Sequence, residues 1–429
     1  MLLYRALSVL ALVVYAPWAL LRSALGIRKM GNLRGRLGFG TPPDLDGGIW
    51  VHAVSVGEVG VARNLLAELA RKTPGRRLGL SVTTAAGAEM ARRSLPTDVA
   101  SFAFPLDLAG PVERALAAVR PGLILLTETE IWPLFLDRAA RRNIPVALVN
   151  GRLSERSFSR YRLAGRAFSR VLSRVALFAM QTREDAARVE RLGARADRVF
   201  VTGNVKYDLP AAPPFADALR LASAAGGRPV FVAASTGPGE EEIVLAAWRS
   251  IAPERRPLLV LAPRRPERFD AVAALVSASG HTMLRRSVPA GAASAPDGAG
   301  AVYLLDSIGE LSSLYREARL AFIGGSLVAT GGHNPIEAWA AGVPVIVGPH
   351  TGNFADVVRD GIALGILEVV PDAAGLSRVI TAALSDPDGL ARRGEAASRA
   401  VVASRGAVAR TADLVLPLLG PAARQAISP

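Results

Sequence analysis

The stretch LAFIGGSLVATGGHNPIEAWAAGVPVIVGPH, residues 320–350, decides the fold of this 429-residue chain. An apolar run leads into a glycine-rich loop, a short helical pattern begins near Asn334, Gly342 and Pro344 end it, and a second apolar run follows. Asn is a favourable helix N-cap, Pro suits the first helical position, and Gly ends helices. The order strand, loop, helix and strand predicts one βαβ unit of a parallel sheet.

The start of the predicted helix is suited to an anion. A helix N-terminus presents unpaired N–H groups and partial positive charge, so a phosphate of a nucleotide fits beside the bare glycine backbone. Glu337, in the first turn, can accept hydrogen bonds from a ribose diol or can only complement the helix dipole, and the pattern leaves both roles open. The loop matches neither the Walker A pattern nor G-x-G-x-x-G.

Length, charge and cysteine content narrow the possibilities further. The chain is long enough for two domains with full cores. Its 51 basic and 37 acidic residues give a formal net charge of +14, which favours nucleic acid, an acidic membrane surface or a phosphorylated substrate as partner. The chain has no cysteine, which excludes disulfides and thiolate metal sites, and its four histidines lack metal-ligand spacing. We therefore expect neither a metal nor a cofactor.

Residues 1–25 are mostly apolar and are followed by a basic cluster, with no acidic residue before Asp44. About 20 apolar residues can span a bilayer, so we expect an N-terminal membrane anchor, either spanning or lying in the interface. The positive-inside tendency then places the rest of the chain on the cytoplasmic side of the inner membrane. A cleaved signal peptide is the alternative, but the apolar region is long and its basic flank lies on the wrong side.

Glu58 follows the predicted buried strand at 48–54, where a helix begins. Ligands of open α/β sheets bind past the carboxyl ends of the strands, so Glu58 is a candidate functional residue. However, Ser55-x-x-Glu58 also matches a capping box, in which Glu58 would bond back to the backbone N–H of Ser55. The pattern alone does not choose between these two roles.

Glu128 and Glu130 follow the apolar run at 122–127, which reads as a central parallel strand. Side chains at i and i+2 of an extended backbone point the same way, which predicts that the two carboxylates lie near each other. Alternatively, both cap the helix expected to begin near Pro133.

Arginines stand at positions 152, 156, 160, 162, 166, 170 and 174, mostly four residues apart. On one helix this spacing makes a basic stripe. Apolar neighbours such as Phe158, Leu163 and Phe168 would let that helix lie against an anionic lipid surface or a phosphorylated glycolipid. A solvated basic face is the alternative.

The second half repeats the α/β rhythm, and prolines between 209 and 214 predict a linker with Lys206 beside it. We therefore expect a membrane anchor at 1–25, a Rossmann-like domain at 26–210, a second one at 211–410, and a C-terminal helix or tail at 411–429 that packs back on the first domain. Two doubly wound halves joined by such a linker are typical of the GT-B glycosyltransferase architecture, in which the two domains face a cleft.

Seven motifs, in order along nearly the whole chain, resemble those of the lipid A Kdo transferases. They are His52–Glu58, Thr127–Pro133, Asn150–Ser157, Gly203–Asp208, Ala262–Phe269, Asp306–Leu311 and Gly324–Glu337.

The resemblance implies an inverting transfer of Kdo, an acidic eight-carbon sugar, from CMP-Kdo to a hydroxyl of the lipid A precursor lipid IVA, at a membrane with anionic lipids. It implies that Glu58 is the general base and that Glu128 and Lys206 stabilise the transition state. The residues that it implies for CMP binding are Pro263, Arg264, Ile308, Gly309, Glu310, Asn334, Pro335, Ile336 and Glu337.

The chain departs from the family pattern at three positions: Gly237 and Arg265 stand where histidine is usual, and Leu134 where asparagine is usual. These departures concern contacts with the donor and leave the reaction class unchanged. The rival function among enzymes is another GT-B activity on a UDP-sugar, either a transferase or an epimerase. A membrane-tethered nucleic-acid binder is the rival from another class, but no recognised nucleic-acid motif is present, so we expect no nucleic acid partner.

Overall fold

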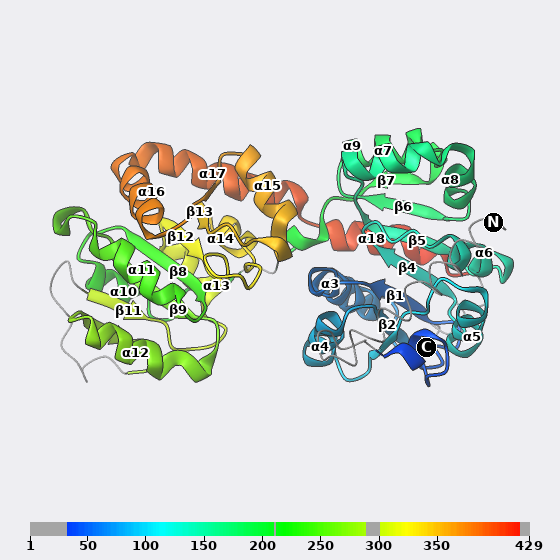
Figure 1. Cartoon of the computed structure of the whole chain (residues 1–429), viewed down its shortest axis with the longest axis horizontal. Coiled ribbons are helices and arrows are strands. Elements are labelled where there is room, and N and C mark those ends of the chain that lie inside the picture. The colour runs from blue at the N-terminus through cyan, green and yellow to red at the C-terminus, as the bar shows by residue number, and fades with distance from the viewer. Residues whose placement is uncertain (1–31, 210–211, 289–300, 421–429) are drawn as a thin grey trace, which may run out of the picture. The chain divides into compact units, whose positions relative to one another are not determined.

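The computed structural model describes residues 32–209, 212–288 and 301–420, which divide into two compact units (Figure 1). Unit 1 comprises residues up to Asp208 together with those from Ser404 onward, and unit 2 runs from Leu209 to Ala403. The sequence placed these boundaries after residues 210 and 410. The expected membrane anchor at 1–25 lies outside the described residues, and within them no helix is long and apolar enough to cross a membrane.

Unit 1 is built on a seven-stranded, fully parallel sheet in the order β3-β2-β1-β4-β5-β6-β7. Ile49 of β1 is in register with Leu78 of β2 and with Leu123 of β4. The strands are β1 (Ile49–Ala53), β2 (Leu78–Val82), β3 (Ala100–Ala103), β4 (Leu123–Thr127), β5 (Val146–Gly151), β6 (Leu177–Met180) and β7 (Val199–Val201).

Helices cover both faces of this sheet. They are α2 (Leu33–Arg36), α3 (Val56–Lys72), α4 (Ala85–Ser94), α5 (Ala109–Val119), α6 (Pro133–Arg141), α7 (Glu155–Leu163), α8 (Gly165–Leu172), α9 (Arg183–Arg191) and α18 (Ala407–Val415), with short 3-10 turns η1 (Ala196–Arg198), η2 (Val205–Tyr207) and η7 (Leu416–Leu418).

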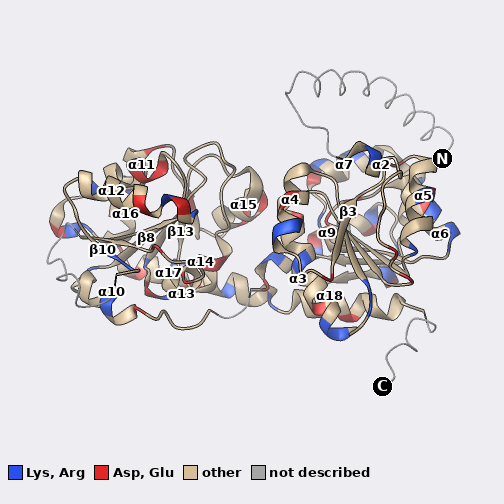
Figure 2. Ribbon diagram, turned by 90° about the horizontal axis from the view of Figure 1, so that it is seen from below, with Lys and Arg blue, Asp and Glu red and all other residues tan. Residues whose placement is uncertain are grey.

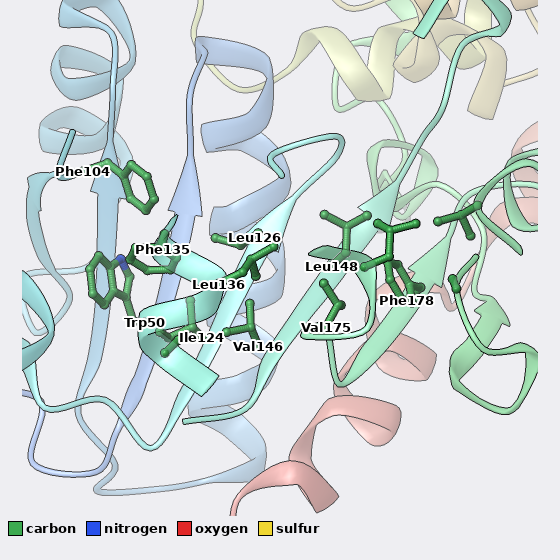
Figure 3. Close-up of a cluster of buried hydrophobic side chains, with 14 of the residues drawn as sticks. Trp50, Phe104, Ile124, Leu126, Phe135, Leu136, Val146, Leu148, Val175 and Phe178 are labelled. Carbon is green, nitrogen blue, oxygen red and sulfur yellow. The ribbon is translucent and has the colours of Figure 1, made fainter. Parts of the chain in front are cut away.

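Alternation along the strands separates two cores in unit 1. Ile49, Val51 and Ala53 face the layer of α3, α4 and α18. Trp50 faces the opposite layer of α5, α6, α8 and α9, as Figure 3 shows for its neighbours Phe104 and Phe135. Successive strand residues point to opposite faces, so a sheet covered on both sides is apolar at nearly every position. This is the continuous apolar pattern from which the sequence predicted central strands.

The C-terminal helix α18 belongs to unit 1. The Asp208 carboxylate accepts hydrogen bonds from the backbone N–H groups of Gly406, at 3.0 Å, and Val408, at 2.9 Å, and so holds the start of the helix. Lys72 of α3 forms an ion pair with Asp413 of α18. Segments from both ends of the chain therefore complete one fold.

Five of the seven arginines of the basic stripe lie on two helices rather than one, and Arg152 and Arg174 flank these helices. The helix breaks at Ala164 and Gly165, where α7 ends and α8 begins, so the expectation of a single continuous helix was wrong. Tyr161 stacks on Phe168 with ring centroids 4.3 Å apart. Phe158 and Phe168 are buried, so these two rings pack inside unit 1 and offer no apolar surface, whereas Leu163 at the break is 88% exposed. Figure 2 shows basic residues, in blue, on α7.

Unit 2 repeats the plan with a second seven-stranded parallel sheet, in the order β10-β11-β9-β8-β12-β13-β14. The strands are β8 (Val230–Thr236), β9 (Leu258–Pro263), β10 (Thr282–Arg285), β11 (Ala301–Leu304), β12 (Leu320–Ile323), β13 (Val345–Val347) and β14 (Leu367–Val369).

The helices of unit 2 pack around this sheet, and buried residues of α11, α12 and α16 cover one face of β8 and β9. The helices are α10 (Ala218–Ala225), α11 (Glu240–Arg249), α12 (Phe269–Ala278), α13 (Leu311–Leu314), α14 (Ile336–Ala340), α15 (Ala355–Ala363), α16 (Ala373–Ser385) and α17 (Pro387–Ser404), with 3-10 turns η3 (Pro253–Arg255), η4 (Pro266–Arg268), η5 (Tyr315–Glu317) and η6 (Gly352–Phe354).

The βαβ unit predicted from residues 320–350 is present as β12, α14 and β13. The helix α14 is only five residues long, and Gly342, with φ +77°, follows its end. A positive φ is costly for residues with a side chain, which explains the glycine at this turn.

Candidate active site

Each sheet has one switch point, the place where the strand order reverses. In unit 1 the chain adds β2 and β3 on one side of β1 and then crosses over to place β4 on the other side. In unit 2 the same happens between β8 and β12. Ligands of open parallel sheets bind past the carboxyl ends of the strands at such points. The candidate residues of both units gather at these two edges.

Glu58 lies at the switch point of unit 1. It is 7% exposed, in the first turn of α3, and its Oε2 accepts hydrogen bonds from the Val54 N–H and the Thr127 hydroxyl, both at 2.9 Å. Its Oε1 accepts from the Ser55 hydroxyl at 2.9 Å. Thr127 is the last residue of β4, so the Glu58 carboxylate connects the two strands that flank the switch point.

The capping box predicted at this position is only half formed. The Ser55 hydroxyl accepts a hydrogen bond from the Glu58 N–H at 3.4 Å, as in a capping box. The carboxylate, however, bonds to the N–H of Val54, one residue before the cap, and to the hydroxyl of Thr127 on another strand. Glu58 therefore does more than cap α3.

The surroundings of Glu58 shift its pKa upward. Burial, followed by the charge of Glu128, raises the pKa of Glu58 against the hydrogen bonds that lower it. The Thr127 Oγ lies 2.8 Å from the His52 carbonyl oxygen as well as 2.9 Å from Glu58, and its one hydrogen serves one acceptor at a time. If Glu58 takes up a proton, it can donate to the Thr127 oxygen while Thr127 donates to His52. The network thus accommodates both protonation states.

Glu128 and Lys206 form an ion pair beside Glu58, with 2.7 Å between the Lys206 Nζ and the Glu128 Oε1. Lys206 lies in η2, whose first residue, Val205, donates its N–H to the Asn150 side chain at 2.9 Å. Asn150 is fully buried and begins the Asn150–Ser157 motif. The sequence indicated no role for its side chain. The structure thus brings Glu58, Glu128 and Lys206 together, and Asn150 positions the segment that carries the lysine.

The sequence predicted an extended backbone from Glu128 to Glu130, and this was wrong. Glu128 has φ +54°, so the chain turns immediately after β4 and the extended alternation stops there. Glu130 nevertheless lies near the other carboxylates. Burial, followed by the charge of Glu58, raises the pKa of Glu130 to about 7. The catalytic residues implied by the family resemblance did not include Glu130, although the sequence Thr127-Glu-Thr-Glu130 indicates a pair of carboxylates at this point.

At the switch point of unit 2, the backbone N–H groups of the glycine-rich loop are already paired. The Glu240 carboxylate accepts hydrogen bonds from the N–H groups of Gly325 at 2.6 Å and of Ser326 and Leu327 at 2.9 Å. It also accepts the Gly237 N–H at 2.9 Å. A protein carboxylate therefore occupies these amides, and the phosphate site expected at the helix start near Asn334 stays a prediction.

The first residues predicted for CMP binding follow β9 and β11 at the same edge of the sheet. Pro263 ends β9, and the Arg264 N–H donates to the Thr236 carbonyl oxygen at 3.0 Å. Ile308 is 75% exposed, and Gly309 has φ +87°. Glu310 is held by the Ser307 hydroxyl and by Arg286, whose hydrogen bonds outweigh the opposing effect of burial and lower the pKa of Glu310.

The remaining predicted CMP residues surround the start of α14. The Asn334 side chain accepts a hydrogen bond from the Ile336 N–H at 3.0 Å, which is the expected capping contact. Pro335 and Ile336 are buried, whereas Asn334 and Glu337 are half-buried. Because β11, β9, β8 and β12 are consecutive in the sheet, the structure gathers all nine residues along one edge.

Of the three departures from the family pattern, two make backbone hydrogen bonds to carboxylates and the third is exposed. Gly237 donates to Glu240, and Arg265 is exposed at the start of η4. Leu134 is 1% exposed in α6 and donates its N–H to Asp107 at 3.1 Å. Among residues 32–209, 212–288 and 301–420, no group of three or more His, Cys, Asp or Glu residues is arranged to hold a metal ion.

Comparison with known proteins identifies the relatives of the chain. Residues 31–209 match the family described as 3-deoxy-D-manno-octulosonic-acid transferase (kdotransferase), and residues 299–400 match glycosyl transferases group 1. The chain is 37% identical over 377 residues to a 3-deoxy-D-manno-octulosonic acid transferase of Haemophilus influenzae, with 87% of each chain covered. It is 38% identical over 398 residues to the Bordetella pertussis protein of that name, with 90% of this chain and 91% of that one covered.

The fold has solved counterparts. MurG of Acinetobacter baumannii superposes with a TM-score of 0.52 at 13% sequence identity, over 86% of this chain and 99% of that one. At this level of identity the likeness concerns the fold alone.

Proposed function

Because the chain belongs to the family of 3-deoxy-D-manno-octulosonic acid (Kdo) transferases, we propose that it moves Kdo from CMP-Kdo to a hydroxyl of lipid IVA, the lipid A precursor, with inversion and with Glu58 as general base. The observation that carries this proposal is the setting of Glu58. It lies at the carboxyl ends of β1 and β4, its pKa is raised, and two of its three hydrogen-bond donors are hydroxyls that can reorient.

The chemistry needs one base. CMP leaves as a phosphate monoester and needs little help from an acid, whereas the acceptor hydroxyl must lose a proton as the new bond to the anomeric carbon forms. The Glu58 carboxylate takes up that proton. A raised pKa brings a carboxylate closer to the operating pH, where general bases are most efficient. Glu130 lies near enough for the charge of Glu58 to raise its pKa further, after burial.

Charge that develops during transfer is offset by fixed cations. As CMP departs, negative charge grows on its phosphate and positive character grows on the anomeric carbon. Lys206 is held by Glu128 at 2.7 Å, so this ammonium group is oriented before the substrate arrives. In unit 2, Arg264 follows β9 and is exposed at the carboxyl edge of the sheet. We assign CMP to that edge, from Pro263 and Arg264 through Ile308–Glu310 to Asn334–Glu337.

The proposal is tested by incubating the full chain with CMP-Kdo and a tetraacylated lipid A precursor and reading the products by mass spectrometry. A mass increase of the acceptor by one or more Kdo units is the expected result. Competition between CMP and UDP for the donor site separates this reaction from a GT-B activity on a UDP-sugar. Unchanged acceptor, together with stronger binding of UDP than of CMP, would overturn the proposed donor.

We expect helices α7 and α8 to bind the cytoplasmic leaflet of the inner membrane, which carries anionic lipids. In the described part of the chain, five arginines of α7 and α8 have no carboxylate within ion-pair distance, and Leu163 projects between the two helices. Each such arginine near an anionic bilayer contributes about 1 kcal/mol of binding. The five are Arg156, Arg160, Arg162, Arg166 and Arg170.

Vesicle sedimentation tests whether α7 and α8 bind an anionic membrane. Replacing Arg160, Arg162 and Arg166 by Gln should weaken binding to phosphatidylglycerol vesicles and leave any binding to phosphatidylcholine vesicles unchanged. A matched control replaces Arg92 and Arg93, which pair with Glu89 on α4. Equal loss in the control and the test variant would contradict the assignment.

A further inference from the structure

The glycine-rich loop that follows β12 holds an anion supplied by the protein itself. Glu240 is fully buried, and each of its two carboxylate oxygens accepts two backbone N–H groups, from Gly237 and Gly325 on one side and from Ser326 and Leu327 on the other. A carboxylate with four such donors is well satisfied. These amides are therefore closed to a second anion, and a bound anionic group must be held by other residues of this edge.

The same loop folds back and places the imidazole of His333 on top of Gly325. The N–H groups of Gly332 and His333 donate to the carbonyl oxygens of Gly325, at 2.6 Å, and Gly324, at 3.1 Å. Gly325 has φ +70°, and a Cβ built on it would lie 3.0 Å from the Cδ2 and Nε2 atoms of the His333 ring. Glycine is thus required here both for its backbone conformation and for the close approach of the ring.

The His333 ring is available to a ligand. Across the described residues, neither ring nitrogen makes a hydrogen bond, and neither is among the fully buried unpaired atoms of the chain. His333 directly precedes Asn334, and it lies near enough to Arg264 for that charge to affect its pKa. Arg264 has no carboxylate partner in the described part of unit 2. Burial, followed by the charge of Arg264, lowers the pKa of His333, against a smaller opposing effect of Glu240. The ring is thus neutral near pH 7, with one N–H to donate.

We propose that His333 is a donor-binding residue whose ring N–H donates to an anionic oxygen of the sugar nucleotide, beside Arg264, because Glu240 already occupies the loop amides. This assignment rests on the proposed function. A neutral imidazole N–H and a guanidinium fork together suit an oxygen of a phosphate or of a carboxylate. CMP-Kdo carries both groups, and the binding measurements below distinguish them.

Binding of three ligands to the full chain, measured by isothermal titration calorimetry, tests the proposal. The ligands are cytidine, CMP and CMP-Kdo, and the variants are His333→Ala and His333→Gln. Loss of a hydrogen bond to a charged group weakens binding by about ten-fold or more. His333→Ala should weaken CMP by this factor and leave cytidine unchanged if the phosphate is the partner. If the Kdo carboxylate is the partner, only CMP-Kdo weakens. His333→Gln, which keeps an N–H donor, should recover part of the loss.

A matched control and three contrary results complete the test. His350→Ala removes an exposed histidine of the same unit and should leave all three affinities unchanged. Unchanged affinities in His333→Ala, or equal weakening of cytidine and CMP, would overturn the assignment, because the first shows no contact and the second a general disturbance of the loop. A wild-type protein that binds neither CMP nor CMP-Kdo would overturn the proposed donor, and this assignment with it.

Discussion

The two units place a glutamate at the same point of the same topology and use it differently. Glu58 follows β1 and Glu240 follows β8, each in the first turn of the next helix. Each carboxylate reaches across the switch point to the neighbouring strand's carboxyl end. Glu58 contacts Thr127, the last residue of β4, and Glu240 contacts the glycine-rich loop that follows β12. The position by itself therefore does not determine whether a carboxylate serves structure or chemistry.

The two carboxylates differ in the groups that donate hydrogen bonds to them. Glu240 is held by four backbone N–H groups, which cannot rotate and cannot give up their hydrogens. Glu58 is held by one backbone N–H and two hydroxyls, and a hydroxyl can donate or accept. The four fixed donors hold the Glu240 carboxylate in one orientation, and in this way it shapes the loop. Adjustable donors make a carboxylate that can take up and release a proton.

The sharpest test of this contrast is Glu58→Gln, which keeps the size of the side chain and removes the base. We expect kcat for Kdo transfer to fall by about 10³-fold, the middle of the range for general base catalysis, with CMP binding unchanged. Steady-state kinetics with CMP-Kdo and the lipid acceptor, together with CMP titration, provide the measurement. Glu68→Gln, on the outer face of α3 and paired with Arg71, is the control. Full activity in Glu58→Gln would leave Glu58 with a capping role only.

The matching change in unit 2 is Glu240→Gln. An amide offers one acceptor oxygen to the four N–H groups and turns an NH2 group toward some of them, so we expect unit 2 to lose about 3 kcal/mol of unfolding free energy. Urea unfolding followed by tryptophan fluorescence measures the loss. Glu242→Gln, an exposed neighbour in the same helical turn, should change little. A stable Glu240→Gln protein with impaired catalysis would contradict the structural role.

A smaller effect is expected at the ion pair beside Glu58. Lys206→Met removes a cation that Glu128 orients, and loss of one preorganised charge costs about 10²-fold in kcat. Lys206→Arg should recover part of the activity, because it keeps the charge. The melting temperature of each variant, compared with that of the unaltered protein, separates lost catalysis from lost folding. Loss of stability in Lys206→Met without loss of kcat would reduce the pair to a structural contact.

The effect that is smallest at each step of one pH unit concerns Glu130. The pKa of Glu130 is about 7 in the folded protein against an ordinary value of 4.5, so between these values the folded state binds more protons than the unfolded state. The free energy of unfolding therefore falls as pH rises from about 4.5 to about 7, by at most about 1.4 kcal/mol per pH unit from this group. Glu130→Gln should remove that part of the slope, and Glu113→Gln, at a surface ion pair, should not. Denaturant titrations across this pH range measure both, and an unchanged slope in Glu130→Gln would contradict the assigned pKa.

Much of the fold could be predicted from local patterns. Continuous apolar runs gave the central strands of both sheets, since a strand covered on both faces is apolar throughout. The helix break at Ala164 was missed, because the four-residue spacing of arginines continues through it. The turn at Glu128 was also missed, since a positive φ at a glutamate leaves no mark in the sequence.

Site residues that lie in a recognisable motif could be predicted from the sequence. Contacts between segments that are far apart in the chain could not. The sequence named Glu58, Glu128 and Lys206 from three separate motifs. It gave no sign that Asn150 holds the segment before Lys206, because those residues are far apart in the chain. The hydrogen bonds from residues 325–327 to Glu240 join two distant segments in the same way, and the sequence gave no sign of them.

Residue order alone determined that this chain forms two parallel α/β units, that it carries an excess of arginine, and that its motifs belong to the Kdo transferases, since periodicity and motif spacing are local properties. Only the tertiary structure decided which carboxylate is held by fixed backbone donors and which by hydroxyls that can reorient. That choice depends on donors brought in from other strands and on the burial they create, and neither can be read along a single segment.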